Sequence, residues 1–195
     1  MPMAFPILLT NDDGINSPGL QELASSLNAR GHPLVVLAPL TEQSAVGMKL
    51  TLRDDMAFQE HTDIADTIRV NEEVPLRVFS LDGSPCDCVI VAIDGGLRAW
   101  APEIDPWMCI SGINRGPNLS VDVLHSGTVS AARESALYGL PSLSVSLATY
   151  SHEDYSDSIR ATLDVVAGLS SFVTNKPENL CLLYTSPSPR DATLS

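Results

Sequence analysis

The stretch Ile7-Leu8-Leu9-Thr10-Asn11-Asp12-Asp13-Gly14 decides the fold that we expect for this chain. Its apolar half is typical of a short buried strand, and the strand ends at one amide, two adjacent carboxylates and a glycine. Neighbouring strand residues point to opposite faces, so Asp12 and Asp13 can reach one site only where the chain turns. Gly14 permits that turn because glycine adopts backbone angles closed to other residues. Ligands of open α/β sheets bind at the carboxyl ends of strands, so the two aspartates predict a metal site there.

A helix and a second strand are expected directly after this turn. Ser17-Pro18 is typical of a helix start, apolar residues recur at helical spacing over residues 18–30, and Gly31 follows as a stop. Residues 34–38 form the second apolar run. A strand, helix and strand in this order predict a parallel pair with a right-handed crossover. We therefore expect a three-layer αβα, Rossmann-like fold with a mainly parallel sheet, in one domain over residues 1–180.

The rest of the chain predicts further elements of the same fold. Residues 50–82 alternate short β-like pieces with polar turns, which predicts a β-hairpin excursion with strands at 67–70 and 76–79. Other expected elements are a helix over 84–93, a strand at 107–110, a helix ended by Gly139, a strand at 142–147 and a helix over 155–174. The character of the sequence changes over the tail of residues 181–195. Residues 180–183 could start another strand, but Tyr184-Thr185-Ser186-Pro187-Ser188-Pro189-Arg190-Asp191 lacks this periodicity and looks like a translated cloning or sequencing adapter. We expect this tail to lie outside the fold.

Composition excludes several classes of partner. The 195 residues carry 11 Lys and Arg against 24 Asp and Glu, a net charge of −13, which argues against a nucleic-acid polymer. A phosphorylated small molecule would need a cation to enter so acidic a protein, which favours a divalent metal. With no signal peptide and no long apolar run, we expect a cytoplasmic protein without a membrane partner. The four cysteines are expected to be reduced, and Cys86-Asp87-Cys88 offers only two soft-metal ligands.

Polar loops follow the other predicted strands. Ser44 lies in the loop after the second strand, and Ser111-Gly112-Ile113-Asn114 follows the strand at 107–110. Ser126-Gly127-Thr128 precedes a helix, where backbone N–H groups are ready to bind a phosphate oxyanion or where the serine is an ordinary N-cap. The carboxyl ends of parallel strands meet at one edge of the sheet. These loops are therefore expected beside the acidic turn.

In this order, the loops resemble the SurE (survival protein E) family of metal-dependent nucleoside monophosphate phosphatases, also called 5′-nucleotidases. The resemblance covers about residues 7–147 and includes Gly83-Ser84-Pro85-Cys86-Asp87-Cys88 at the family's Gly-Thr-Pro-x-Asp-Cys segment. It implies one divalent ion, Mg²⁺ or Mn²⁺, coordinated by Asp12, Asp13, Ser44 and Asn114. Oxygen ligands of this kind independently suit a hard cation. It also implies substrate or phosphate binding by Asn11, Asn118, Ser126, Gly127 and Thr128, with Asp12, Asp13 and Asn114 as catalytic residues.

The resemblance further implies a hydrolase of the 5′-nucleotidase or acid phosphatase type, acting on nucleoside 5′- and 3′-monophosphates and assembled as dimers or tetramers. Metal-activated water is the expected nucleophile, with an aspartyl phosphate at Asp12 and a leaving-group proton from His125 as alternatives. Asp12 and Asp13 are adjacent, so they do not fit the Asp-x-Asp motif of haloacid-dehalogenase phosphatases. The spacing of the histidines does not fit a zinc deacetylase. A non-catalytic nucleotide-binding or interaction module, or an inactive fragment, stays the alternative function.

The chain also departs from the family pattern. Ser120, His125, Arg115 and Ser135 replace the family's usual residues, and none of them is an expected metal ligand. The family normally continues with a strand of the type Leu-Asn-Val-Asn-x-Pro and further residues, a pattern that is lost after residue 183. We therefore expect the C-terminal part that helps to build the oligomer to be missing, and the chain to be poorly soluble or to associate aberrantly.

Overall fold

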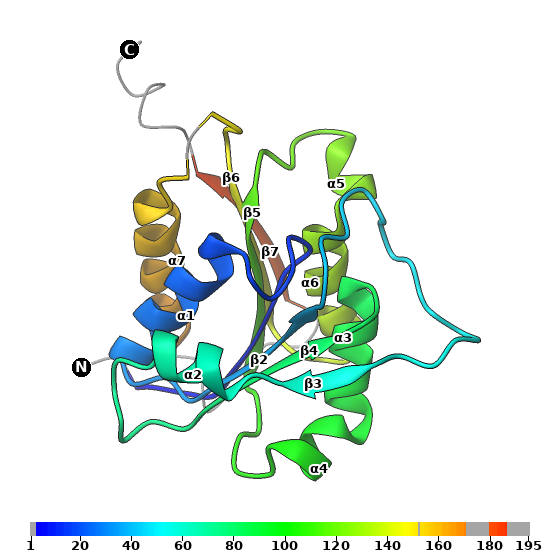
Figure 1. Cartoon of the computed structure of the whole chain (residues 1–195). Coiled ribbons are helices and arrows are strands. Elements are labelled where there is room, and N and C mark those ends of the chain that lie inside the picture. Colours follow the sequence, from blue (N-terminus) through cyan, green and yellow to red (C-terminus); the bar gives the residue numbers. More distant parts are fainter. Residues whose placement is uncertain (1–2, 152, 171–179, 187–195) are drawn as a thin grey trace.

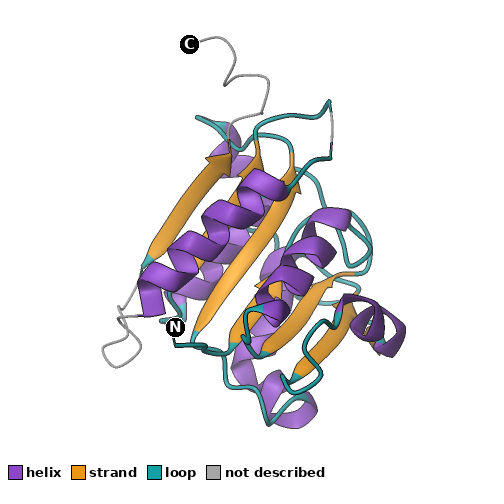
Figure 2. Cartoon of the chain, turned by 90° about the vertical axis from the view of Figure 1, so that its left-hand side faces the viewer, coloured by secondary structure: helices purple, strands orange, loops and turns teal. Residues whose placement is uncertain are grey.

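The computed structural model describes residues 3–151, 153–170 and 180–186. A seven-stranded sheet in the order β3-β4-β2-β1-β5-β6-β7 forms its middle layer, and helices cover both faces (Figure 1, Figure 2). The strands are β1 (Ile7–Thr10), β2 (Leu34–Pro39), β3 (Phe58–Glu60), β4 (Leu76–Leu81), β5 (Met108–Arg115), β6 (Ser142–Leu147) and β7 (Cys181–Ser186). Every neighbouring pair is parallel except β3 and β4. The expected three-layer fold with a mainly parallel sheet is confirmed.

Alternate residues of the central strand β1 face opposite helical layers. The helices are α1 (Pro18–Ala29), α2 (Thr62–Ile68), α3 (Pro85–Val91), the π-helical segment η1 (Ala92–Gly96), α4 (Leu97–Trp100), α5 (Asp122–His125), α6 (Gly127–Leu137) and α7 (Ser156–Leu169). Ile7 and Leu9 are buried with residues of α1, α2 and α7, whereas Leu8 is buried with residues of α3 and α6. Burial on both faces explains why this strand is apolar at every position. No helix in the described ranges is long and apolar enough to cross a membrane.

The region between β2 and β4 differs from the expected β-hairpin. Residues 67 and 68, expected in a strand, close the helix α2 instead, and β4 joins the main sheet parallel to β2. Ile64, Ala65 and Ile68 are buried at helical spacing, so packing against the sheet overrides the local strand preference. The antiparallel partner of β4 is β3, which comes before α2.

The strand β5 continues past its expected end at residue 110. It pairs with β1 as far as Ser111 and with β6 as far as Arg115, with a register shift between Ser111 and Asn114. Gly112 lies in this irregular stretch at a φ of 139°, and a Cβ there would lie 2.4 Å from the carbonyl oxygen of Val145. Only glycine allows β6 to approach so closely.

The sheet continues past residue 180, where we expected the domain to end and at most the start of another strand. Residues 181–186 form the edge strand β7, parallel to β6. Leu182 and Tyr184 pack against the core while Leu183 is 45% exposed, so the segment alternates with the period of a strand. This strand-like alternation lies within residues 181–195, which we expected to form a tail outside the fold. Residues 187–195 of the expected tail, and 171–174 of the expected long helix, lie outside the described residues.

Candidate active site

The turn after β1 is built by Asn11, which is fully buried. Its amide nitrogen donates to the carbonyl oxygen of Gly14 (3.0 Å) and to Oγ of Ser17 (2.9 Å), and its Oδ1 accepts from the Gly14 N–H (3.1 Å). Gly14 has a φ of 92°, which favours glycine. Ser17 in turn caps α1 by accepting from the N–H of Leu20. Asn11 therefore supports the site by shaping the turn, and it does not line the cavity described below.

Asp12 is tied to the start of α6. Its carboxylate accepts from the backbone N–H of Thr128 (3.0 Å) at one oxygen and from the Thr128 hydroxyl at the other. Gly127 makes this approach possible, because a Cβ on it would lie 2.8 Å from Cβ of Asp12. Burial raises the pKa of the Asp12 carboxyl, and the hydrogen bonds from Thr128 partly offset that rise. Gly127 and Thr128 thus determine the orientation of the Asp12 carboxylate.

Asp13 points to the end of β5. Its Oδ2 accepts from the backbone N–H of Arg115 at 2.9 Å. Burial, and then the neighbouring charge of Asp12, raise the pKa of Asp13 to about 6. Within the described ranges, no Lys, Arg or His side chain forms an ion pair with either aspartate. A buried and a half-buried carboxyl that are adjacent and have no ion-paired cationic side chain make the site suitable for a metal cation.

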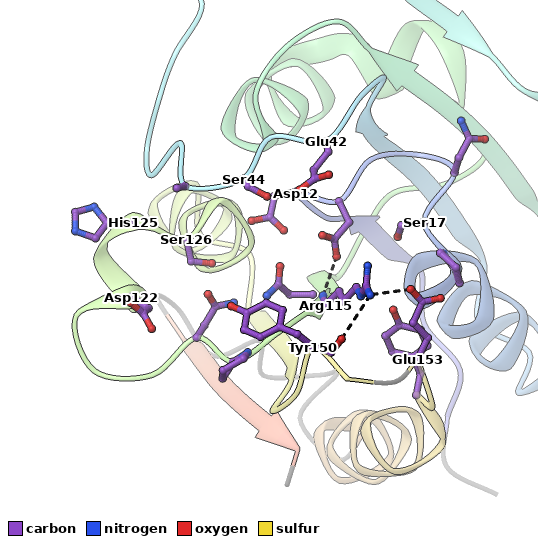
Figure 3. A pocket seen from close by; sticks show the side chains of 18 residues that line it. Asp12, Ser17, Glu42, Ser44, Arg115, Asp122, His125, Ser126, Tyr150 and Glu153 are labelled. Atoms are coloured by element: carbon purple, nitrogen blue, oxygen red, sulfur yellow. Dashed lines mark hydrogen bonds and ion pairs between the residues drawn. The ribbon is translucent and has the colours of Figure 1, made fainter. Parts of the chain in front are cut away.

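Asp12 and Asp13 line a cavity of about 600 Å³. Figure 3 shows the side chains that surround it. Six of the residues expected in the site line it: Asp12, Asp13, Ser44, Asn114, Asn118 and Ser126. Three others, Asn11, Gly127 and Thr128, are not among its lining residues. Its wall also contains residues that we did not expect there, namely Glu42, Arg115, Asp122, Tyr150, Glu153 and Tyr155. The structure therefore brings loops after β1, β2, β5 and β6 together at one edge of the sheet.

Ser44 and Asn114 present oxygen atoms beside the aspartates. The hydroxyl of Ser44 donates to Oε1 of Glu42 at 2.5 Å, which leaves the lone pairs of its oxygen for a cation. The amide nitrogen of Asn114 donates to the carbonyl oxygen of Gly116 (2.8 Å), so its Oδ1 is the atom that Asn114 can offer to a cation. Nothing in the sequence indicates that Glu42 lies in the site, because its position depends on the conformation of the loop after β2.

The donor set fits a hard cation. It comprises two carboxylates, one hydroxyl and one amide oxygen, which suit Mg²⁺ or Mn²⁺ better than a soft metal. In the described part of the chain, no group of three or more His, Cys, Asp or Glu residues could hold a metal ion by itself. A cation at this site would therefore also need the amide and hydroxyl oxygens as ligands. Cys86 and Cys88 are buried, burial raises the pKa of both thiols, and Asp87 binds Thr51 and Ser84. These features do not favour the soft-metal alternative.

The phosphate-binding residues are arranged differently from the expectation. Ser126 is the N-cap of α6, where its oxygen accepts from the N–H of Val129 at 3.1 Å. The N–H and hydroxyl of Thr128 donate to Asp12 in this structure, whereas phosphate binding by Ser126, Gly127 and Thr128 stays a prediction. Asn118 donates to Oγ of Ser146 at 2.7 Å and lines the cavity. His125, in α5, also lines it.

Fold and site together define an α/β protein with a carboxylate-lined cavity at the carboxyl edge of a parallel sheet. The model of the family described as Survival protein SurE matches residues 7–191, and the chain belongs to this family. A protein named 5′-nucleotidase SurE from Synechococcus sp. (strain JA-3-3Ab) is 39% identical over 172 residues, which are 88% of this chain and 62% of that protein.

Two further comparisons agree with this membership. A 5′-nucleotidase SurE from Desulfitobacterium hafniense (strain DSM 10664 / DCB-2) is 42% identical over 149 residues, 76% of this chain and 53% of that protein. The crystal structure of the SurE protein from Aquifex aeolicus superposes with a TM-score of 0.71 at 30% identity, over 93% of this chain and 66% of that one. The chain therefore spans 53% to 62% of the length of these two sequence relatives.

Proposed function

We propose that this chain is a metal-dependent phosphomonoesterase that hydrolyses nucleoside 5′- or 3′-monophosphates to nucleoside and phosphate. The observation that carries the proposal is the pair Asp12 and Asp13, which face one cavity without an ion-paired cationic side chain in the described ranges. The name 5′-nucleotidase SurE, borne by relatives at about 40% identity, supports this class of substrate.

The ion would be held by Asp12, Asp13, Oγ of Ser44 and Oδ1 of Asn114. When bound, a divalent ion neutralises charge on phosphoryl oxygens and lowers the pKa of water, so that hydroxide forms near neutral pH. Thr128 holds both oxygens of Asp12, and this fixes the direction in which that carboxylate meets the cavity. Such support of a ligand by its neighbours commonly matters as much as the ligand itself.

The opposite wall can bind the phosphoryl group. The hydroxyl of Ser126 accepts from the N–H of Val129, so its proton can be donated to a phosphoryl oxygen. The amide nitrogen of Asn118 uses one proton on Ser146 and retains a second. His125 lines the same cavity and is the candidate that protonates the leaving alkoxide.

The test is phosphate release from a panel of nucleoside monophosphates with Mn²⁺ or Mg²⁺, repeated with chelator and in Asp13→Asn. We expect release that needs the metal and falls by at least about 100-fold in the variant, the upper range for losing a positioned group at a metal site. Asp66→Asn, an exposed aspartate of α2, is the matched control and should retain wild-type rates.

Phosphate release that survives chelation and Asp13→Asn would contradict the proposal. No release from folded protein would favour the alternative, a nucleotide-binding or interaction module or an inactive fragment. Binding of a nucleoside monophosphate without turnover, measured by calorimetry, would separate the binding module from the inactive fragment.

We also propose that the protein acts in the cytoplasm and forms the homodimer or homotetramer that the family resemblance implies, with further association of this chain as its concentration rises. The net charge of −13 supports a small nucleotide as substrate over a nucleic-acid polymer. Light scattering on the purified chain measures the assembly directly, and cell fractionation measures its location.

A further inference from the structure

Tyr150 is an exposed aromatic residue in the wall of the candidate active site. It lies in the loop between β6 and α7, lines the same cavity as Asp12 and Asp13, and is 66% exposed. In the view of Figure 3 its ring lies between Ser126 and Arg115. The other tyrosine of this cavity, Tyr155, is only 2% exposed. Tyr150 therefore offers the accessible ring of the two.

The ring is held against the chain that leaves β5. A Cβ on Gly116 would lie 2.0 Å from Cε1 of Tyr150, so the ring rests directly on the backbone there. Arg115 fixes the same loop, because its Nη2 donates to the carbonyl oxygen of Tyr150 (3.5 Å) and its Nε pairs with Glu153 at 3.3 Å. One side of the ring is thereby supported by protein while most of the residue stays accessible.

The ring also rests on the residue that follows the partner of Asp13 in the chain. Arg115 donates its backbone N–H to Asp13, and Gly116 is the next residue, about 3.5 Å further along the chain. Asp13 and Tyr150 line the same cavity, so a ligand whose charged end meets Asp13 can extend toward Tyr150. An exposed aromatic ring in a cavity is best used by a flat apolar partner, since stacking removes apolar surface from water.

We propose that Tyr150 stacks against the base of the nucleotide and so distinguishes nucleotides from phosphate esters that lack a base. This inference rests on the proposed nucleotidase function and adds a specificity-determining residue to it. Stacking recognises the flat face that all bases share, so Tyr150 selects for the presence of a base more than for its identity.

The experiment compares adenosine 5′-monophosphate with ribose 5-phosphate in wild type, Tyr150→Ala and Tyr150→Phe. We expect Tyr150→Ala to raise KM for the nucleotide about tenfold more than KM for ribose 5-phosphate, the effect of losing one stacked ring. Tyr150→Phe keeps the ring and should keep the wild-type ratio. Tyr138→Ala, an exposed tyrosine at the end of α6 outside this cavity, is the matched control.

Calorimetric binding of adenosine, which needs no catalysis, separates this inference from the proposed function. Hydrolysis of both substrates with an unchanged KM ratio in Tyr150→Ala would overturn the stacking role while leaving the nucleotidase intact. If neither substrate were hydrolysed but adenosine bound, and Tyr150→Ala weakened that binding about tenfold, the proposed nucleotidase activity would be overturned and the base site would be retained. If the protein neither hydrolysed these substrates nor bound adenosine, both the nucleotidase proposal and the base site would be overturned.

Discussion

At the scale of single residues, Asp12 and Asp13 are neighbours in sequence with different surroundings. Asp12 is 5% exposed and takes its hydrogen bonds from Thr128 at the start of α6. Asp13 takes a hydrogen bond from the backbone of Arg115 at the end of β5. The turn at Gly14 allows both carboxylates to face one cavity, as the sequence predicted. Their partners come from distant parts of the chain.

Asp13 gives the metal-free protein a defined pH dependence. Burial and the charge of Asp12 raise its pKa from 3.8 to about 6 on folding. A carboxyl whose pKa is raised on folding stabilises the fold while it is protonated. Its contribution is therefore complete below about pH 4 and is lost as the pH rises through about 6. In chelator, we expect the unfolding temperature of wild type to fall relative to that of Asp13→Asn between pH 4 and pH 7.

Thermal unfolding of both proteins in chelator measures this difference directly. Adding Mn²⁺ at pH 7 should reverse the order, because the ion binds the ionised carboxylate of wild type and stabilises the native state by mass action. A gap between the two proteins that does not change with pH would contradict the raised pKa.

At the scale of elements, the loop of residues 40–57 carries Ser44 to the site and is anchored at several points. Near its start, the N–H of Gln43 donates to the carbonyl oxygen of Asp12 at 2.7 Å. Further along, Asp87 at the start of α3 accepts from the N–H (2.9 Å) and the hydroxyl (2.8 Å) of Thr51. These hydrogen bonds anchor the loop of residues 40–57 beside the cavity. The bonds from Thr51 explain why α3 carries a carboxylate, that of Asp87, in its first turn.

Breaking the Asp87 anchor should destabilise the fold. Burial alone would raise the pKa of Asp87, but hydrogen bonds from Thr51 and Ser84 outweigh it and lower the pKa, so the residue is an ionised acceptor. In Asp87→Asn the amide cannot accept all of these bonds, and we expect a loss of about 1–3 kcal/mol in the free energy of unfolding. Urea unfolding measures it, with exposed Asp82→Asn in the preceding turn as control. Equal stability of the two variants would contradict the anchor.

At the scale of the whole molecule, the sheet leaves one edge open in the described part of the chain. No strand in the described ranges pairs with the outer side of β7, where Leu183 is 45% exposed. Leu119, Val121 and Leu124, in α5 and the turn before it, are between 55% and 64% exposed. Unpaired edges and exposed apolar side chains both promote association.

We therefore expect this chain to associate beyond a dimer or tetramer as its concentration rises. Light scattering over a concentration series measures the effect. Leu183→Lys places a charge on the open edge and should reduce the association. Leu52→Lys, at an 83% exposed leucine of the loop 40–57, adds the same charge elsewhere and is the control. A stable dimer or tetramer at every concentration would contradict the prediction.

The sequence by itself determined the fold class, because the order strand, helix, strand and the continuous apolar run of β1 admit few other arrangements. It also determined where the acidic pair lies, because strand ends of a parallel sheet share one edge. It did not determine the helix α2, since burial of Ile64 and Ile68 against the sheet overrides local propensity.

Only the tertiary structure decided which partners each site residue contacts. Thr128 binds Asp12 across 116 positions of sequence, and Arg115 binds Asp13 across 102. The same holds for Tyr150, which carried no sequence signal and acquires its place only because β5 and β6 end side by side. Local patterns specify elements through nearby contacts, whereas hydrogen bonds between distant segments exist only after the sheet has brought those segments together.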